Sequence, residues 1–159
     1  MLEQINRIKM GDPEDFTNFM TAVIDESAFN TISSYIDTAK NEKETYRIIA
    51  GGKYDKSKGY FIEPTLIESK TPDSKLMKEE IFGPVLTIYI YNDEDFDRTL
   101  ELCNKTSAYG LTGAIFAKNR YIISTMEKKL RHSAGNFYIN DKPTGAVVDC
   151  CAVILLVCE

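Results

Sequence analysis

The spacing of apolar residues switches repeatedly between helical and strand periods, and this constrains the fold of the chain more than any other feature. Residues 25–40 predict an amphipathic helix. Its expected buried stripe contains Ala28, Ile32, Tyr35, Ile36 and Ala39. A short β-rich run follows at residues 46–50, and the Gly51-Gly52 pair ends it. A chain that alternates in this way folds as packed layers of helix and sheet.

The middle of the chain is rich in strand-like segments. Residues 60–62 and 65–67 are separated by Pro64, which cannot donate to a ladder and so predicts a sheet edge or a break. Residues 85–91 alternate in the strand period, with Leu86, Ile88 and Ile90 on one face and Thr87, Tyr89 and Tyr91 on the other. Both faces are largely apolar, so we expect a strand that is covered on two sides.

The second half continues the alternation. Asn92 is a suitable N-cap for a helix with Phe96, Leu100 and Cys103 on its apolar side, and this helix should end near residues 109–110. A strand at 111–116, a helix at 120–130 and a strand at 137–139 follow. On the last helix, Ile122, Ile123, Met126 and Leu130 should point inward. The order predicts an α/β fold with a mostly parallel sheet and flanking helices.

Composition excludes several classes of protein. A chain of 159 residues with 43% hydrophobic residues fits one globular domain or part of one. The net charge of -5 disfavours a nucleic-acid partner, which needs a surplus of Lys and Arg. The sequence shows neither a targeting segment nor an apolar run long enough to span a membrane. Four cysteines with three crowded at the end, and a lone His132, predict neither a disulfide framework nor a metal site.

An acidic pair, Glu79-Glu80, precedes the rigid corner at Gly83-Pro84. Two interpretations remain open from the residues alone. The simpler one is a solvated charge at a turn. In the other, one carboxylate accepts hydrogen bonds from a polyol such as a ribose, as dinucleotide sites often do. Adjacent residues in extended chain point to opposite faces, so the pair is poorly suited to hydrolysis with two carboxylates.

Several motifs, in order along the chain, resemble those of the NAD(P)-dependent aldehyde dehydrogenases. Residues 80–85 (EIFGPV) resemble the E-x-F-G-P motif, residues 10–13 (MGDP) the G-D-P turn, residues 109–113 (YGLTG) the Y-G-L segment and residues 135–140 (GNFYIN) the G-x-x-x-x-N strand. Within the family, residues 78–85 and 134–148 most resemble the enzymes that oxidise L-glutamate γ-semialdehyde in proline catabolism. The resemblance implies that residues 1–148 are part of an aldehyde dehydrogenase catalytic domain, followed by a divergent apolar tail at 149–159.

The resemblance assigns roles to four residues. Glu80 matches the glutamate that binds the nicotinamide ribose of NAD, and Phe82 matches the aromatic ring beside the nicotinamide. Gly145 and Ala146 match the loop whose backbone N–H groups hold the α-carboxylate of the substrate. Some relatives have Ser where this chain has Ala146, which implies weaker carboxylate binding by about 1 kcal/mol. Without the family, residues 144–146 would be interpreted as a flexible turn.

The family reaction needs a cysteine nucleophile and a glutamate base, and this chain supplies no matching catalytic residue. The family cysteine stands in a G-Q-x-C context upstream of the position that Met1 matches. Cys103 lies on the apolar side of a predicted helix and is expected in the core. The tail contains six consecutive apolar residues, 152–157, which predict either a strand that pairs along a sheet edge or a segment prone to aggregation. After Val148 the tail differs from the sequence expected of the family, and an alternative or truncated gene product would explain the difference.

Two functions are therefore predicted. The first is the C-terminal portion of an NAD-dependent L-glutamate γ-semialdehyde dehydrogenase, inactive alone. The second is a non-catalytic module that joins or inhibits a full-length oligomer. The family implies a small aldehyde substrate, a homo-oligomer for the full-length enzyme and, in eukaryotes, the mitochondrial matrix.

Overall fold

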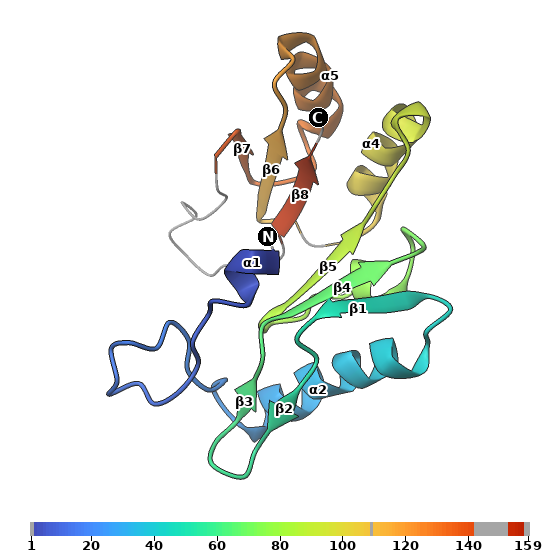
Figure 1. The fold of residues 1–159 in the computed structure, drawn as a ribbon. Coiled ribbons are helices and arrows are strands. Elements are labelled where there is room, and N and C mark those ends of the chain that lie inside the picture. Colours follow the sequence, from blue (N-terminus) through green and yellow to red (C-terminus); the bar gives the residue numbers. More distant parts are fainter. Residues whose placement is uncertain (1, 109, 142–152, 158–159) are drawn as a thin grey trace. The chain divides into compact units, whose positions relative to one another are not determined.

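The computed structural model describes residues 2–108 and 110–141 and, as backbone alone, residues 153–157. These residues form two compact units (Figure 1). Unit 1 contains residues 2–77 and 81–90, and unit 2 contains residues 78–80 and those from 91 onward. The elements of the first unit are α1 (Leu2–Ile5), α2 (Glu26–Asn41), β1 (Tyr46–Ala50), β2 (Tyr54–Asp55), β3 (Phe61–Ile62), β4 (Thr65–Ser69), α3 (Lys75–Lys78, whose last residue falls in unit 2) and β5 (Val85–Tyr89).

Helix α2 organises the core of unit 1. The Asp25 carboxylate caps it by accepting a 2.7 Å hydrogen bond from the backbone N–H of Ala28. The predicted stripe is confirmed, because Ile32, Ile36 and Ala39 are buried, and Phe29 joins them. This face packs against Ile62 of β3 and against the sheet residues Ile48 and Val85. Figure 1 shows α2 along one side of the sheet that contains β1, β4 and β5.

The sheet of unit 1 has the order β1-β4-β5, in which β4 pairs antiparallel with β1 and parallel with β5. Strand β1 ends where predicted, at Gly51 and Gly52, which have φ values of 71° and 88° that suit glycine. The break predicted at Pro64 is also confirmed, because β3 pairs with β2 in a separate two-stranded sheet and β4 begins at Thr65.

Strand β5 differs from its prediction. It ends at Tyr89 rather than Tyr91, and it is an edge of the described sheet. Leu86 and Ile90, which share one face, are 43% and 64% exposed, so the expectation of a strand covered on both faces is wrong at these positions. Apolar residues on both faces make a strand suitable for burial between two layers. They do not show that the described residues include an element that packs on the second face.

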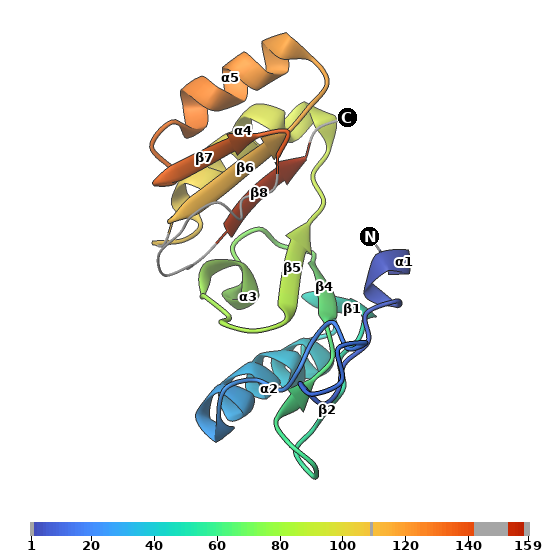
Figure 2. The same ribbon diagram turned by 90° about the vertical axis from the view of Figure 1, so that its left-hand side faces the viewer.

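Unit 2 contains η1 (Asp93–Asp95), α4 (Phe96–Lys105), β6 (Thr112–Phe116), α5 (Arg120–Leu130), β7 (Asn136–Ile139) and β8 (Val153–Val157). Its core consists of Leu100 from α4, Ile115 from β6, Ala117 just after β6, and Met126 and Leu130 from α5. Ile122 and Ile123 pack against it partly buried, as predicted. Figure 2 shows α5 alongside the sheet of order β7-β6-β8, in which both pairs are parallel.

The start and end of α4 were predicted incorrectly. Asn92 caps the 3-10 turn η1 and makes no side-chain capping hydrogen bond, so α4 begins only at Phe96. The helix ends at Lys105, where Thr106 bonds back to Leu102 through both its N–H and its hydroxyl. The α/β class with mostly parallel pairing is confirmed, since three of the five described strand pairs are parallel. The tail strand β8 pairs along β6, as one of the two interpretations of the tail predicted.

Candidate functional site

The corner at residues 81–84 is held tightly within unit 1. The N–H of Gly83 donates to the carbonyl of Ile81 and the N–H of Val85 donates to the carbonyl of Gly83, both at 2.8 Å. Two such bonds in succession force the backbone through a sharp bend. The carbonyl of Pro84 accepts from the N–H of Thr65, also at 2.8 Å, which ties the bend to β4. The rigid corner that the sequence indicated is therefore present.

Gly83 is required at this bend for steric reasons. A Cβ at this position would lie 2.4 Å from Cδ1 of Ile32, whose buried side chain belongs to α2. The preceding residue, Phe82, has 71% of its surface exposed. Packing of α2 on the corner thus holds the backbone, while the ring of Phe82 faces solvent and is available for a ligand.

The carboxylate candidates lie just before the corner. Glu80 follows α3 by two residues and is half-buried, whereas Glu79 is exposed. Glu80 belongs to unit 2 and Phe82 to unit 1, so the surroundings of each are described only within its own unit. Gly145 and Ala146 lie outside the described residues. The roles of all four residues stay predictions.

Asn140 links the carboxyl end of β7 to that of β6 through hydrogen bonds. Its backbone has a φ of 54°, a left-handed conformation that asparagine tolerates better than most residues. Its side chain forms two hydrogen bonds with the backbone of Ala117, accepting from the N–H at 2.9 Å and donating to the carbonyl at 3.0 Å. Its own N–H donates to the carbonyl of Ile115 at 2.8 Å. We call these three hydrogen bonds the Asn140 clamp.

The clamp lies where ligand loops begin. In parallel sheets, ligands bind in the loops beyond the carboxyl ends of the strands, and the predicted substrate loop at 144–146 follows Asn140 by four residues. Sequence reasoning identified Asn140 only as part of a motif. Its role depends on a partner 23 residues away, which no local spacing reveals.

Cys103, which was expected in the core, is partly buried and lies at the border of the unit 2 core. It packs against the cluster around Leu100 and Met126. Burial raises the pKa of the Cys103 thiol from 9.0 to about 11. The side chain is therefore a neutral thiol at neutral pH, which is a poor nucleophile. The other three cysteines lie outside the residues that the structure describes.

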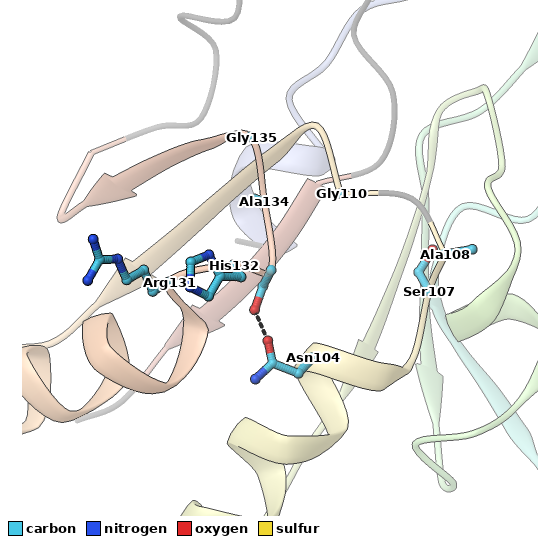
Figure 3. A pocket seen from close by; sticks show the side chains of 9 residues that line it. Asn104, Ser107, Ala108, Gly110, Arg131, His132, Ala134 and Gly135 are labelled. Atoms are coloured by element: carbon cyan, nitrogen blue, oxygen red, sulfur yellow. Dashed lines mark hydrogen bonds between the residues drawn. The ribbon is translucent and has the colours of Figure 1, made fainter.

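A pocket of about 440 Å³ in unit 2 lies at the amino-terminal ends of β6 and β7, opposite the end that carries the Asn140 clamp (Figure 3). It is lined by residues that follow α4 and α5 and precede β6 and β7, including Ser107, His132 and Ser133. Asn104 spans it, donating to the carbonyl of Lys129 at 2.7 Å and accepting from the hydroxyl of Ser133. In parallel sheets, ligands bind beyond the carboxyl ends of the strands. This pocket lies at their amino ends, so it is not where the predicted ligand loops lie.

Within 2–108 and 110–141, no group of three or more His, Cys, Asp or Glu side chains is arranged to hold a metal ion. Among the helices described, none combines the length and apolar character needed to cross a membrane.

Comparison with known proteins gives consistent matches along most of the chain. The model of the aldehyde dehydrogenase family matches residues 1–151. The mitochondrial delta-1-pyrroline-5-carboxylate dehydrogenase of Dictyostelium discoideum is 56% identical over 144 residues, which are 91% of this chain and 26% of that protein. The Homo sapiens protein of the same name is 50% identical over 149 residues, covering 93% and 26% respectively.

Solved structures agree with these matches. The Delta-pyrroline-5-carboxylate dehydrogenase from Mycobacterium tuberculosis bound with NAD superposes with a TM-score of 0.81 at 38% identity, covering 94% of this chain and 27% of that one. Betaine aldehyde dehydrogenase from Staphylococcus aureus in complex with NAD+ gives 0.73 at 33% identity, covering 88% and 27%. The chain spans about a quarter of the length of the curated relatives that it matches.

Proposed function

The chain belongs to the aldehyde dehydrogenase family, and on this premise we propose that it is part of an NAD-dependent dehydrogenase that oxidises L-glutamate γ-semialdehyde to L-glutamate in proline catabolism. The observation that carries the proposal is the high identity, along nearly the whole chain, to relatives named delta-1-pyrroline-5-carboxylate dehydrogenase. Delta-1-pyrroline-5-carboxylate is the cyclic form of this semialdehyde.

Two residues, Glu80 just before the corner and Phe82 within it, are assigned to the nicotinamide end of NAD. In this proposal the Glu80 carboxylate accepts hydrogen bonds from the ribose hydroxyls, and the exposed ring of Phe82 contacts the nicotinamide. When bound, NAD accepts the hydride that the aldehyde loses. The packing of Ile32 against Gly83 supports this role, because it fixes the backbone beside Phe82 before any ligand binds.

The substrate carboxylate is assigned to the backbone N–H groups of Gly145 and Ala146. These residues lie outside the described part of the chain, but the loop that contains them begins at the Asn140 clamp. The clamp supports the assignment because a loop anchored at its start loses less conformational freedom when it binds a carboxylate.

The nucleophile is assigned to the part of the enzyme that this chain does not contain. Cys103 is unsuitable, because partial burial against the core raises its pKa to about 11. We therefore expect this chain alone to show no turnover. We further infer that the complete enzyme is a homo-oligomer and that it works in the mitochondrial matrix. The names of the relatives support a mitochondrial location.

The proposal is tested by joining the chain to the upstream region of the Dictyostelium discoideum relative and measuring NAD reduction with L-glutamate γ-semialdehyde. Oxidation of this substrate in preference to betaine aldehyde is the expected result. Glu80→Gln in the joined protein should raise the KM for NAD or lower kcat by about 10-fold or more, since a hydrogen bond to a charged group contributes roughly 1.5–3 kcal/mol.

The neighbouring carboxylate provides the matched control. Glu79→Gln removes the same charge from an exposed position one residue away, and its kinetics should equal those of the unchanged protein. If the two variants behave alike, the ribose contact is not made by Glu80. If the joined protein folds but does not oxidise the semialdehyde, the substrate assignment fails.

A second candidate function is supported by the exposed apolar residues of unit 1. Phe16, Ile24 and Phe19 are 98%, 91% and 79% exposed, and contact with another protein would remove these large apolar side chains from water. The chain would then be a non-catalytic module that joins or inhibits a full-length oligomer of the family. Mixing it with the active human relative distinguishes the two functions, because only this one predicts co-assembly and altered activity.

A further inference from the structure

The side chain of Ile32 on α2 lies directly against the backbone of Gly83. A Cβ added to Gly83 would lie 2.8 Å from Cγ1 and 3.2 Å from Cγ2 of Ile32, and closer still to its Cδ1. Apart from atoms of the adjoining residues, these are the three nearest atoms to that Cβ. Ile32 is 2% exposed, so its side chain is enclosed by the core and cannot leave the corner without opening a cavity.

The residues on either side of Gly83 are anchored in the same core. Ile81 and Val85 both pack against the buried cluster that contains Ile32. Phe82 lies between two positions that face this core, so its ring is directed away from α2. These contacts all belong to unit 1, and they do not depend on what covers the ring of Phe82 in a longer protein.

We propose that Ile32 is a positioning residue for the cofactor. Its side chain sets the position of the Gly83 backbone, and through it the direction of the Phe82 ring at the nicotinamide. The inference rests on the proposed function of Phe82 and adds to it a residue of α2 that does not itself touch NAD. A contact whose geometry is fixed before binding loses less conformational freedom on binding, so shortening Ile32 weakens NAD binding while the fold is kept.

Two matched substitutions test this role. Ile32→Val removes Cδ1, and in the joined protein the Kd for NAD, measured by calorimetry, should rise by about 3-fold or more. Ile36→Val makes the same change one turn further along α2, in the same buried cluster, and should leave the Kd within about 2-fold. Both variants shorten a buried isoleucine by one methyl group, so a difference between them reports the corner rather than the core. Equal Kd values for the two variants would overturn the inference.

A double variant tests whether Ile32 acts through Phe82. Phe82→Ala removes the ring, so adding Ile32→Val to it should change the Kd for NAD by less than about 2-fold. The ring is then no longer present to be misplaced. If Ile32→Val weakens NAD binding as much without the ring as with it, Ile32 acts elsewhere in the protein and the positioning role is wrong.

Hydrogen exchange tests the contact without any cofactor, in the chain as it stands. Gly83 is not among the glycines with a positive φ, so Gly83→Ala adds the clashing Cβ without backbone strain. The probe is the amide of Thr65, which donates to the carbonyl of Pro84. Gly83→Ala should accelerate its exchange by about 10-fold or more. In an Ile32→Ala chain, which lacks all three clashing atoms, the same substitution should accelerate it by less than about 2-fold.

Ile36→Ala is the control for the exchange experiment. In that chain Gly83→Ala should accelerate exchange by the full factor, because the clash with Ile32 remains. If Gly83→Ala alone prevents folding, recovery of the fold on adding Ile32→Ala becomes the expected result. Equal acceleration in the two alanine backgrounds, or no recovery, would contradict the contact on which the inference depends.

Failure of the proposed function gives a different result. If the unchanged joined protein binds no NAD, the role proposed for Phe82 is wrong and the positioning role of Ile32 is wrong with it. If the unchanged joined protein binds NAD and oxidises the semialdehyde, but Ile32→Val leaves the Kd for NAD unchanged, only the positioning role is wrong.

Discussion

At the scale of single residues, Asn140 combines two properties that substitutions can separate. Its backbone is left-handed, and its side chain forms two hydrogen bonds with Ala117. Glycine adopts this backbone conformation freely but has no side chain to make the clamp. Alanine lacks the clamp and is also disfavoured in the left-handed region.

We therefore expect Asn140→Gly to lower the free energy of unfolding by about 1–3 kcal/mol through the lost hydrogen bonds. Asn140→Ala should lower it by about 1 kcal/mol more through backbone strain. Urea denaturation measures both changes. If Asn140→Gly is as stable as the unchanged chain, the clamp contributes nothing and only the backbone conformation matters.

Cys103 makes stability depend on pH in the alkaline range. Its pKa is raised from 9.0 to about 11 by burial, so the folded state holds the proton more tightly than the unfolded state. The stabilisation is complete below pH 9 and is lost as the pH rises through 11. The free energy of unfolding of the unchanged chain should fall more steeply over this range than that of Cys103→Ala, in which other groups titrate but the thiol is absent. Parallel curves would contradict the burial argument.

At the scale of helices and strands, the sequence predicted the elements that are long enough to contain a period. The helix over 120–130 has the expected bounds because the Asn119 side chain caps it and Met126 and Leu130 lie on its buried side. Three short elements, α1, α3 and β2, contain no repeat and were missed. The candidate site was predicted less fully, because the Asn140 clamp and the contact of Gly83 with Ile32 join distant segments.

The cap of α2 offers a test at this scale. Asp25→Ala removes the acceptor for the N–H of Ala28, and should lower the free energy of unfolding by about 1 kcal/mol. Asp25→Asn keeps an oxygen in the same position and should change stability by only a few tenths of a kcal/mol. Thermal and urea unfolding report the difference. A loss of equal size in both variants would mean that the charge of Asp25, rather than its capping bond, stabilises the helix.

At the scale of the whole molecule, each unit has its own buried cluster. Ile36 lies in the core of unit 1 and Leu100 in that of unit 2, and both are 0% exposed. Ile36→Ala and Leu100→Ala should each lower stability by about 2–5 kcal/mol. Each should accelerate hydrogen exchange mainly within its own unit, so the two variants are controls for each other. Equal acceleration throughout the described chain would show that the units unfold as one.

The division into units has a practical consequence for anyone who wants to divide the gene. The polypeptide passes between the units after Met77, after Glu80 and after Ile90. An open reading frame that starts at codon 91 would encode unit 2 without its residues 78–80, and would discard the carboxylate assigned to ribose. One that stops at codon 77 would omit the corner at Gly83 and strand β5. Neither half can be cloned as one uninterrupted stretch, so work on isolated halves calls for circular permutation or a spliced linker.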